Sequence, residues 1–216
     1  MFRKYEKTYR FFPTPGKINL SKNDISELLS GEVIVEEKMD GANVGIIRHK
    51  HGFSLQKRGS LVGQSEHEQF GYFHNWANNQ NYELLMNLPV NHIIYAELLY
   101  AVHTVFYDKL PSYVLVFDVW DGNSYLNYDK RKDFCDMYNL HMVPLVTRGS
   151  FSKNDISKLI PEKSMYGDFV EGIVLKRYRK NEYLKAKVVN PDFIKIVNAS
   201  EHWSHYNIRK NIVCSQ

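Results

Sequence analysis

Short apolar runs rich in β-branched and aromatic residues recur along the chain and predict most of its strands. Such runs, bounded by polar or turn residues, are typical of buried strands. The predicted strands cover residues 33–35, 44–47, 53–57, 93–100, 113–120, 170–177 and 182–189. The last two flank Arg179-Lys180-Asn181 and are expected to form a hairpin.

Helices are fewer than strands. Residues 66–88 are expected to be helical with a break in the Asn-rich stretch at 78–79, residues 128–138 predict an amphipathic helix, and residues 192–199 a closing one. Ser-Lys-Asn-Asp-Ile-Ser occurs at Ser21 and again at Ser152. Each copy predicts the start of a short helix, because Ser is a favoured N-cap and an acidic residue three positions later can return the hydrogen bond. Strands that seldom alternate with helices favour an α+β fold with antiparallel sheets.

The stretch Glu37-Lys38-Met39-Asp40-Gly41-Ala42-Asn43 joins the first two predicted strands. Asp-Gly between two apolar runs predicts a hairpin or tight turn, because Gly tolerates a positive φ. Lys38 is then expected at the end of a strand with a restricted direction, which suits a nucleophile that must be held in line with its target. Alone, the Lys-x-Asp-Gly pattern also fits an ordinary surface hairpin.

Charged residues also interrupt or end the other predicted strands, where an apolar sheet does not need them. These residues are Arg58, Glu97, Asp118 directly after Phe117, Glu171 and Lys176 at opposite ends of one strand, and Lys185 and Lys187. The alternation of the last two lysines puts both on one face of their strand. Individually, such residues are explained as well by cross-strand ion pairs or by solubility at strand edges, and Phe117 and Val174 by core packing.

Taken together and in this order, these stretches resemble the nucleotidyltransferase motifs of covalent lysyl-nucleotide ligases. They are most similar to the RNA-ligase family that contains the second phage RNA ligase and the kinetoplastid RNA-editing ligases. Asn43 is typical of that family, whereas DNA ligases and capping enzymes usually carry a basic residue at this position. The resemblance covers roughly residues 32–190. It implies an α+β nucleotidyltransferase fold, an ATP-grasp-like ligase adenylylation domain with antiparallel sheets flanked by helices.

The resemblance implies that Lys38 attacks the α-phosphate of ATP, releases pyrophosphate and becomes lysyl-AMP. This step needs a neutral amine, whereas a free lysine titrates near pH ~10.4. Because nearby cations and desolvation lower the pKa of a lysine, we expect Lys176 and Lys187 to supply such charges and to clamp the phosphate. A bound Mg²⁺ or Mn²⁺ would add to this field. The residues implied to be catalytic are Lys38, Asp40, Glu171, Lys176 and Lys187, and those implied to handle the metal are Asp40, Asp118 and Glu171.

Further residues are implied to bind the nucleotide. Glu97 would accept a hydrogen bond from the ribose 2′-OH, Phe117 would stack on adenine, and Val174 would cover the other face of the base. Arg58 would meet the ribose or a phosphate, and Lys185 a phosphate. The complete nucleotide-binding set is Glu37, Lys38, Asn43, Arg58, Glu97, Phe117, Val174, Lys176, Lys185 and Lys187.

The positive charge is concentrated near the C-terminus. Residues 171–216 hold nine Lys/Arg against four Asp/Glu, a balance of +5, while the whole chain carries +4, which leaves −1 for the rest. Such a basic segment suits a phosphate-rich partner, although it also fits a solvated face. No apolar run approaches a membrane span, and the N-terminus lacks the apolar core of a signal peptide. With only Cys135 and Cys214, we expect a reducing, intracellular compartment rather than a disulfide framework.

We expect residues 1–216 to form a single domain without a C-terminal OB or accessory domain, since only 29 residues (216 − 187) follow Lys187. A protein partner could replace such a domain. The expected function is that of an ATP-dependent polynucleotide ligase that joins 3′-OH and 5′-phosphate ends of RNA or of a nicked duplex. Two alternatives stay open, a minimal ATP-dependent DNA ligase and a non-catalytic nucleotide or RNA-end binding module that kept the fold.

Overall fold

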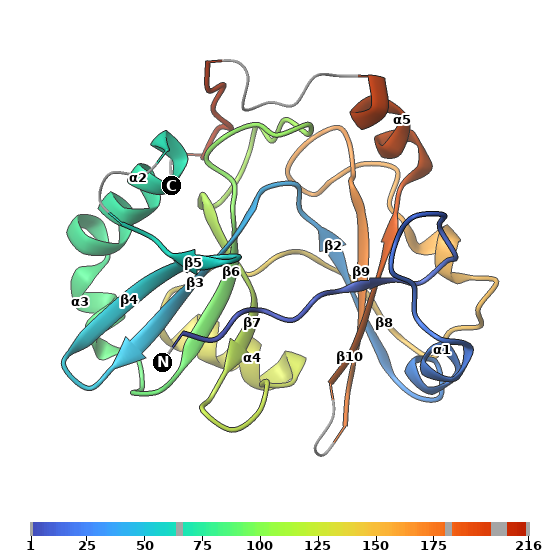
Figure 1. Cartoon of the computed structure of the whole chain (residues 1–216), viewed down its shortest axis with the longest axis horizontal. Helices are drawn as coiled ribbons and strands as arrows, with labels where there is room; N and C mark the ends of the chain where they lie inside the picture. The colour runs from blue at the N-terminus through green and yellow to red at the C-terminus, as the bar shows by residue number, and fades with distance from the viewer. Residues whose placement is uncertain (1, 64–66, 180–182, 200–206, 215–216) are drawn as a thin grey trace.

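Two five-stranded sheets stand side by side, with helices on their outer faces (Figure 1). The computed structural model describes residues 2–63, 67–179, 183–199 and 207–214. The first sheet has the strand order β1-β10-β9-β2-β8 and the second β5-β4-β3-β6-β7. The strands are β1 (Tyr9–Arg10), β2 (Val33–Lys38), β3 (Ala42–His49), β4 (Gly52–Lys57), β5 (Ser60–Leu61), β6 (Ile93–Leu98), β7 (Val114–Trp120), β8 (Leu145–Gly149), β9 (Gly172–Tyr178) and β10 (Tyr183–Val189). The helices are α1 (Lys22–Leu28), α2 (Glu68–Asn75), the π-helix η1 (Trp76–Gln80), α3 (Tyr82–Asn87), α4 (Tyr128–Met137), the 3₁₀-helix η2 (Ile156–Leu159) and α5 (Pro191–Ala199).

The antiparallel α+β architecture predicted from the sequence is confirmed. Strands β9 and β10 pair in antiparallel fashion, as the predicted hairpin requires, although residues 180–182 of its turn lie outside the described residues. The one parallel pairing among the named strands of the described chain joins β1 to β10. None of the described helices is long and apolar enough to cross a bilayer.

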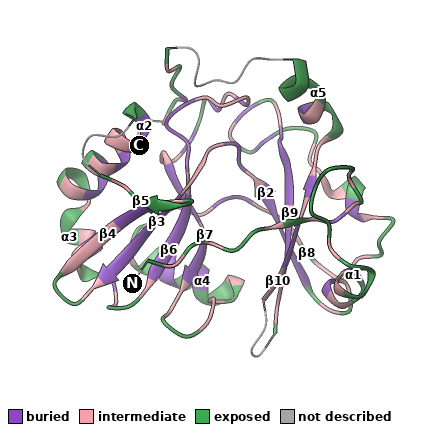
Figure 2. Cartoon of the chain, in the orientation of Figure 1, coloured by how far each residue is buried: buried purple, intermediate pink, exposed green. Residues whose placement is uncertain are grey.

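The apolar runs that predict the strands are largely buried, at consecutive positions in β2, β3 and β6, and the buried strand centres are visible in Figure 2. The first sheet packs its apolar face against α1 and η2 in a core that includes Val35, Leu175 and Ala186. The second sheet packs against α2, η1, α3 and α4 in a separate core around Val44 and Ile94. Because strand side chains alternate between faces, the polar positions of both sheets point away from these cores.

Only the first copy of Ser-Lys-Asn-Asp caps a helix, because the helix after the second copy has Asp155 at its N-cap with no side-chain hydrogen bond to the backbone. Ser21 Oγ accepts a hydrogen bond from the Asp24 backbone N–H, 3.1 Å away, in a full capping box. The second copy leads into the 3₁₀-helix η2. Ile160, the residue before Pro161, has extended backbone and ends this short helix, as expected for a residue that precedes a proline.

The predicted helix over 66–88 is divided as the Asn-rich stretch suggested. Residues 78–79 lie within the π-helix η1 between α2 and α3. There the backbone N–H and the side-chain amide of Asn81 both donate to the Trp76 carbonyl oxygen, at 3.0 Å each. A single wide turn of this kind inside a helix is the usual form of a π-helix.

The Asp40-Gly41 hairpin predicted from the sequence is wrong. Strand β2 pairs with β8 and β9, whereas β3 pairs with β4 and β6 of the other sheet, so residues 39–41 cross from one sheet to the next. Gly41 is needed for a close approach and not for a turn, because a Cβ there would lie 2.5 Å from the carbonyl oxygen of Leu98. The crossing places Lys38 at the junction of the two sheets.

The N-terminal segment crosses between the sheets a second time (Figure 1). The Arg3 carbonyl oxygen accepts hydrogen bonds from Gln56 Nε2 and from the Tyr95 hydroxyl of the second sheet, both at 3.0 Å. Tyr9–Arg10 then pairs with β10 of the first sheet. The segment therefore forms a wall over the space between the two sheets.

Candidate active site

A cavity of about 960 Å³ lies between the polar faces of the two sheets and the N-terminal segment. Most of the nucleotide-binding residues predicted from the sequence line it: Glu37, Lys38, Asn43, Arg58, Glu97, Phe117, Val174, Lys176 and Lys187. Residues from six strands and from the β4–β5 turn meet here although they are far apart in sequence. Asp40, Asp118, Glu171 and Lys185 belong to the same region but do not line the cavity.

Lys38 is held by carboxylates at the end of β2. Its Nζ lies 2.6 Å from Glu171 Oε2, and the two side chains are only 23% and 10% exposed. Glu97 and Asp40 are close enough to act on its charge as well. The amine is thus partly buried, oriented and open to the cavity, as the sequence predicted for the nucleophile.

The expected low pKa of Lys38 is not what the structure shows. Burial alone would lower this pKa, but the negative charges of Glu171, Glu97 and Asp40 outweigh it, so the pKa is raised. Without a nucleotide, therefore, Lys38 is a charged ammonium in an ion pair. The nucleophile role predicted for Lys38 would therefore need additional positive charges beside this amine, which would lower its pKa.

The carboxylates around Lys38 have raised pKa values, because their charged forms are disfavoured. Burial, opposed in part by Lys38, raises the pKa of Glu97 to about 8 and that of Glu171 to about 7. Mutual repulsion within the group, including Asp40, adds to both shifts. A second cation such as Mg²⁺ would relieve this repulsion.

Asp40 organises the loop that follows β6. Its Oδ2 accepts hydrogen bonds from the backbone N–H groups of Thr104 and Val105, at 2.7 and 2.8 Å. Its own backbone N–H donates to the Tyr107 hydroxyl at 2.9 Å. One carboxylate oxygen is therefore engaged in structure, and the charge of the group still acts on Lys38.

The register of the first sheet explains which lysines can act near Lys38. Lys38 pairs with Gly172, and the next cavity-facing row contains Glu36, Val174 and Lys187. Along the strand direction Lys187 is about 7 Å from Lys38 and Lys176 about 13 Å, because strand residues rise by roughly 3.3 Å each, while Lys187 is two strands away and Lys176 one. The pKa of Lys187 is lowered by burial and next by the charge of Lys38, as expected for two lysines on the same face of one sheet.

Lys176 does not stand beside Lys38, and the expectation that it crowds this amine is wrong. Its Nζ is buried in a cluster of charges with Glu36 Oε2 at 2.7 Å and Asp118 Oδ1 at 3.1 Å. Arg131 of α4 completes the cluster, with ion pairs to the same two carboxylates. All four side chains are at most 1% exposed, and together they are electrically neutral.

Asp118 is a member of this charge cluster and not of the carboxylate group at Lys38. Its oxygens accept hydrogen bonds from the hydroxyls of Tyr5 and Tyr183 in addition to Arg131 and Lys176. The nearby cations overcome the effect of burial and lower its pKa. With its oxygens engaged and the side chain fully buried, the predicted metal role of Asp118 is not supported.

A divalent metal would therefore depend on the nucleotide for most of its ligands. In the described part of the chain, no three His, Cys, Asp or Glu residues are arranged to hold a metal ion. Mg²⁺ commonly keeps several waters and binds through one or two carboxylates plus substrate phosphates. Glu97 and Glu171, whose charges repel one another, fit this arrangement.

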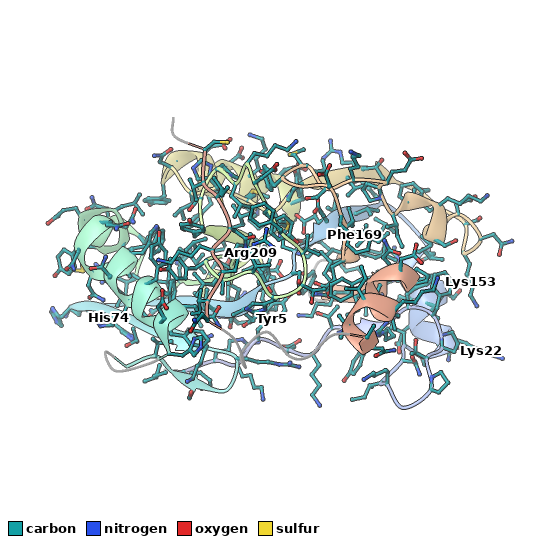
Figure 3. The ribbon with its side chains drawn as sticks, turned by 90° about the horizontal axis from the view of Figure 1, so that it is seen from above. Tyr5, Lys22, His74, Lys153, Phe169 and Arg209 are labelled. Atoms are coloured by element: carbon teal, nitrogen blue, oxygen red, sulfur yellow. The ribbon has the colours of Figure 1, made fainter. Side chains whose placement is uncertain are left out.

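Lys185 is sealed off from the cavity, contrary to its predicted contact with a phosphate. Its Nζ lies 3.4 Å from the centre of the Tyr5 ring and has no hydrogen-bond partner among the described residues. Burial, opposed in part by Asp118, lowers the pKa of Lys185 to about 8. Tyr5, near the middle of the molecule in Figure 3, separates this amine from the pocket.

Phe117 and Val174 face the cavity from opposite sheets, as a slot for a planar base requires. Phe117 is the extra residue of a β-bulge, since Tyr95 pairs with Asp118 and Ala96 with Val116. Bulges re-aim a side chain next to a site. The edge of the Tyr5 ring supports the Phe117 ring, with the centroids 5.0 Å apart.

The sequence does not predict several side chains that build this site, and four of them matter most for its charge and shape. They are Tyr5 and Arg10 of the N-terminal segment, Glu36 of β2, and Arg131 of α4. Glu36 carries a weak signal, as a second acidic residue directly after an apolar run. Tyr5 falls in residues 1–5, which resemble the start of the family, whereas nothing in the sequence indicates Arg10 or Arg131, because a two-residue strand and an amphipathic helix do not reveal their distant partners.

Comparison with known proteins identifies the family. The RNA ligase family model matches residues 31–195. The chain belongs to the RNA ligase family. No curated protein sequence matches the chain.

Solved structures of RNA ligases share the fold of this family member. A structure of *Naegleria gruberi* RNA ligase with PPi has a TM-score of 0.67 at 15% identity, covering 92% of this chain and 59% of that one. A mutant of the same ligase with ATP and Mn has a TM-score of 0.64 at 17% identity, covering 82% and 55%. This chain thus spans less than two thirds of the length of these solved relatives. At this identity the likeness establishes the nucleotidyltransferase fold.

Proposed function

We propose that this RNA ligase family member is an ATP-dependent ligase that acts on RNA ends through a covalent lysyl-AMP intermediate. The observation that carries the proposal is the position of Lys38, whose Nζ opens into the cavity 2.6 Å from Glu171 Oε2. Lys187 lies one row away on the same face. The *Naegleria* ligase, with structures containing ATP and Mn, AMP and Mn, or PPi, supports the choice of nucleotide and metal.

In the first step Nζ of Lys38 forms a bond to the α-phosphorus and the bond to the pyrophosphate oxygen breaks. The amine must first lose a proton, and Glu171 is the acceptor in hydrogen-bond reach. With its pKa raised to about 7, Glu171 is a better base than an ordinary carboxylate. Lys187 would stabilise the negative charge on the phosphate as it develops.

The remaining residues would bind and orient the nucleotide. Phe117 and Val174 would hold adenine, and Glu97 would accept a hydrogen bond from the ribose. Arg58 and Asn43 would meet phosphates or metal-bound water. Mg²⁺ or Mn²⁺, held by Glu171 and Glu97 together with the phosphates, would supply charge neutralisation for the leaving pyrophosphate.

The later steps transfer AMP to a 5′-phosphate and join it to a 3′-OH. They need a nucleic-acid end across the mouth of the cavity, where Lys7, Lys17 and Lys57 stand. A partner protein or further domain could hold the rest of the substrate. A minimal DNA ligase is the alternative enzyme, distinguished by whether the protein seals nicks with a ribose or a deoxyribose at the 3′-OH.

The test of this function is the mass of the denatured protein after treatment with ATP and Mg²⁺. We expect a gain of one AMP that is lost in acid, as a phosphoramidate is. Lys38→Ala should abolish the gain, whereas Lys153→Ala, at the periphery in Figure 3, should leave it intact. ATP binding with no adduct under Mg²⁺ or Mn²⁺ would favour the non-catalytic binding module.

A further inference from the structure

The pairing of β1 with β10 explains why Arg10 faces the cavity. Strand β1 runs parallel to β10, with Tyr9 opposite Ala186 and Arg10 opposite Lys187. Ala186 is fully buried in the core of the first sheet, as is Phe11, the residue after Arg10. Because side chains alternate, Arg10 and Lys187 lie on the other face, and both line the cavity.

The backbone of Arg10 is fixed on both sides. Its N–H donates to the Ile18 carbonyl oxygen at 3.0 Å, and its carbonyl oxygen accepts from the Leu20 N–H at 2.9 Å. The Phe11 N–H donates to the Lys187 carbonyl oxygen at 3.0 Å. A side chain that projects from such a braced strand is better placed for recognition than one on a free terminus.

Arg10 belongs to a group of cations that converges on Lys187. The pKa of Lys187 is lowered by burial and by the charges of Lys38, Arg10 and Arg58, and only Glu171 opposes these effects. Among the described residues, neither Arg10 nor Arg58 has an ion pair with a carboxylate. Glutamates also line the cavity, but cations that form no ion pair with them favour a ligand with several negative charges.

We propose that Arg10, with Lys187 and Arg58, forms a second phosphate subsite that binds the terminal phosphates of ATP. The inference rests on the proposed function, because Lys38 marks the place of the α-phosphate. Arg10 and Lys187 lie on adjacent strands, about 5 Å apart at the backbone, so their side chains reach one phosphate chain together. The planar fork of an arginine binds two phosphate oxygens at once, which a lysine cannot do.

The test compares nucleotides that differ only in their terminal phosphates. Binding of ATP and of AMP is measured by equilibrium dialysis without divalent metal, so that no turnover occurs. We expect Arg10→Gln to weaken ATP binding about tenfold and AMP binding less than about twofold, since one charge-assisted bidentate contact is lost. Arg10→Lys should fall between Arg10→Gln and the wild type.

Lys153→Gln is the matched control, because it removes one positive charge from an exposed site far from the cavity. It should change neither affinity. An equal loss of ATP and AMP binding in Arg10→Gln, or no loss at all, would overturn the proposal. If Arg10→Gln does not fold, the wild type still decides, because inorganic pyrophosphate should compete with ATP and leave AMP binding unchanged.

A 5′-phosphate on a nucleic acid could bind to the same cations as the terminal phosphates of ATP. A second binding experiment distinguishes these two ligands. Short RNA with a 5′-phosphate or a 5′-hydroxyl is bound to the same variants. If Arg10→Gln weakens only the 5′-phosphorylated RNA and leaves ATP unchanged, the subsite belongs to the RNA end and the ATP assignment is wrong. The proposed function can fail separately. In that case the wild type would bind ATP more tightly than AMP but would form no lysyl adduct.

Discussion

The state of a single amine decides whether this site can react. Lys38 is paired with Glu171 at 2.6 Å, and the carboxylates around it raise its pKa in spite of its burial. Lys38 is therefore an ammonium ion in this arrangement, and an ammonium ion is unreactive toward phosphorus. In the proposed reaction, a nucleotide and its metal would reverse this balance, because the metal would neutralise the carboxylates that hold the proton.

We expect the rate of adduct formation to rise with pH, and Glu171→Gln to shift the midpoint of this rise to lower pH. Removing the nearest negative charge takes away the largest contribution that raises the pKa of Lys38. The measurement is the pH profile of the single-turnover rate, which separates a shift of the midpoint from a fall in its plateau. Glu162→Gln, at the exposed surface, should leave the midpoint in place.

We expect the charged form of Glu97 to destabilise the folded protein at alkaline pH. Its folded pKa of about 8 lies above the ordinary value near ~4.3, so the folded state binds its proton more tightly than the unfolded state. This contribution favours folding at low pH and is lost as the pH rises from about 4 to about 8. Glu97→Gln, which can still accept from the Gly41 N–H, should raise the melting temperature at pH 8 relative to the wild type.

At pH 4 the same substitution should have little effect, because Glu97 is then protonated in both states. A difference in melting temperature that does not depend on pH would contradict this account of Glu97.

At the scale of elements, the decisive feature is the passage of the chain from β2 to β3. The two strands lie in different sheets, and residues 39–41 pass between them. Lys38, the proposed nucleophile at the end of β2, is therefore placed opposite the polar face of the second sheet. A hairpin would have left Lys38 at the edge of a single sheet.

Gly41→Ala should destabilise the protein by about 1–3 kcal/mol, because its Cβ would lie 2.5 Å from the Leu98 carbonyl oxygen and force the backbone apart. The same shift should slow adduct formation, since Lys38 is three residues away. Urea unfolding gives the stability, and Gly52→Ala is the control, with no atom within 4 Å of the added methyl group. Equal stabilities for the two variants would show that the crossing tolerates a side chain.

At the scale of the whole molecule, a neutral cluster of buried charges joins the two sheets. Glu36 and Lys176 come from the first sheet, Asp118 from the second, and Arg131 from the helix that covers it. The cluster also fixes the base slot, because Lys176 Nζ donates to the Phe117 carbonyl oxygen. The relative position of the sheets, and with it the width of the cavity, depends on these contacts.

Arg131→Met should lower the free energy of unfolding by about 3–5 kcal/mol, because it leaves Glu36 buried with too few partners. The double variant Glu36→Gln/Arg131→Met should recover part of this loss, since Lys176 and Asp118 then balance each other. Urea unfolding of the single and double variants measures the coupling. Arg148→Gln, which breaks an exposed pair with Asp129, should cost no more than about 1 kcal/mol.

The sequence by itself determined seven of the ten strands among the described residues, the antiparallel class, the candidate nucleophile and nine of the residues that line the cavity, but not β1, β5 or β8. These properties follow from local alternation and from the order of motifs, which a linear pattern contains. Only the tertiary structure decided that Asp40-Gly41 crosses between sheets, that Lys185 is sealed behind Tyr5, and that Lys176 and Asp118 bind each other. It also brought Arg10 beside Lys187. The physical reason is that register and long-range charge pairing depend on which strands become neighbours, and nothing in the spacing of residues along the chain specifies that.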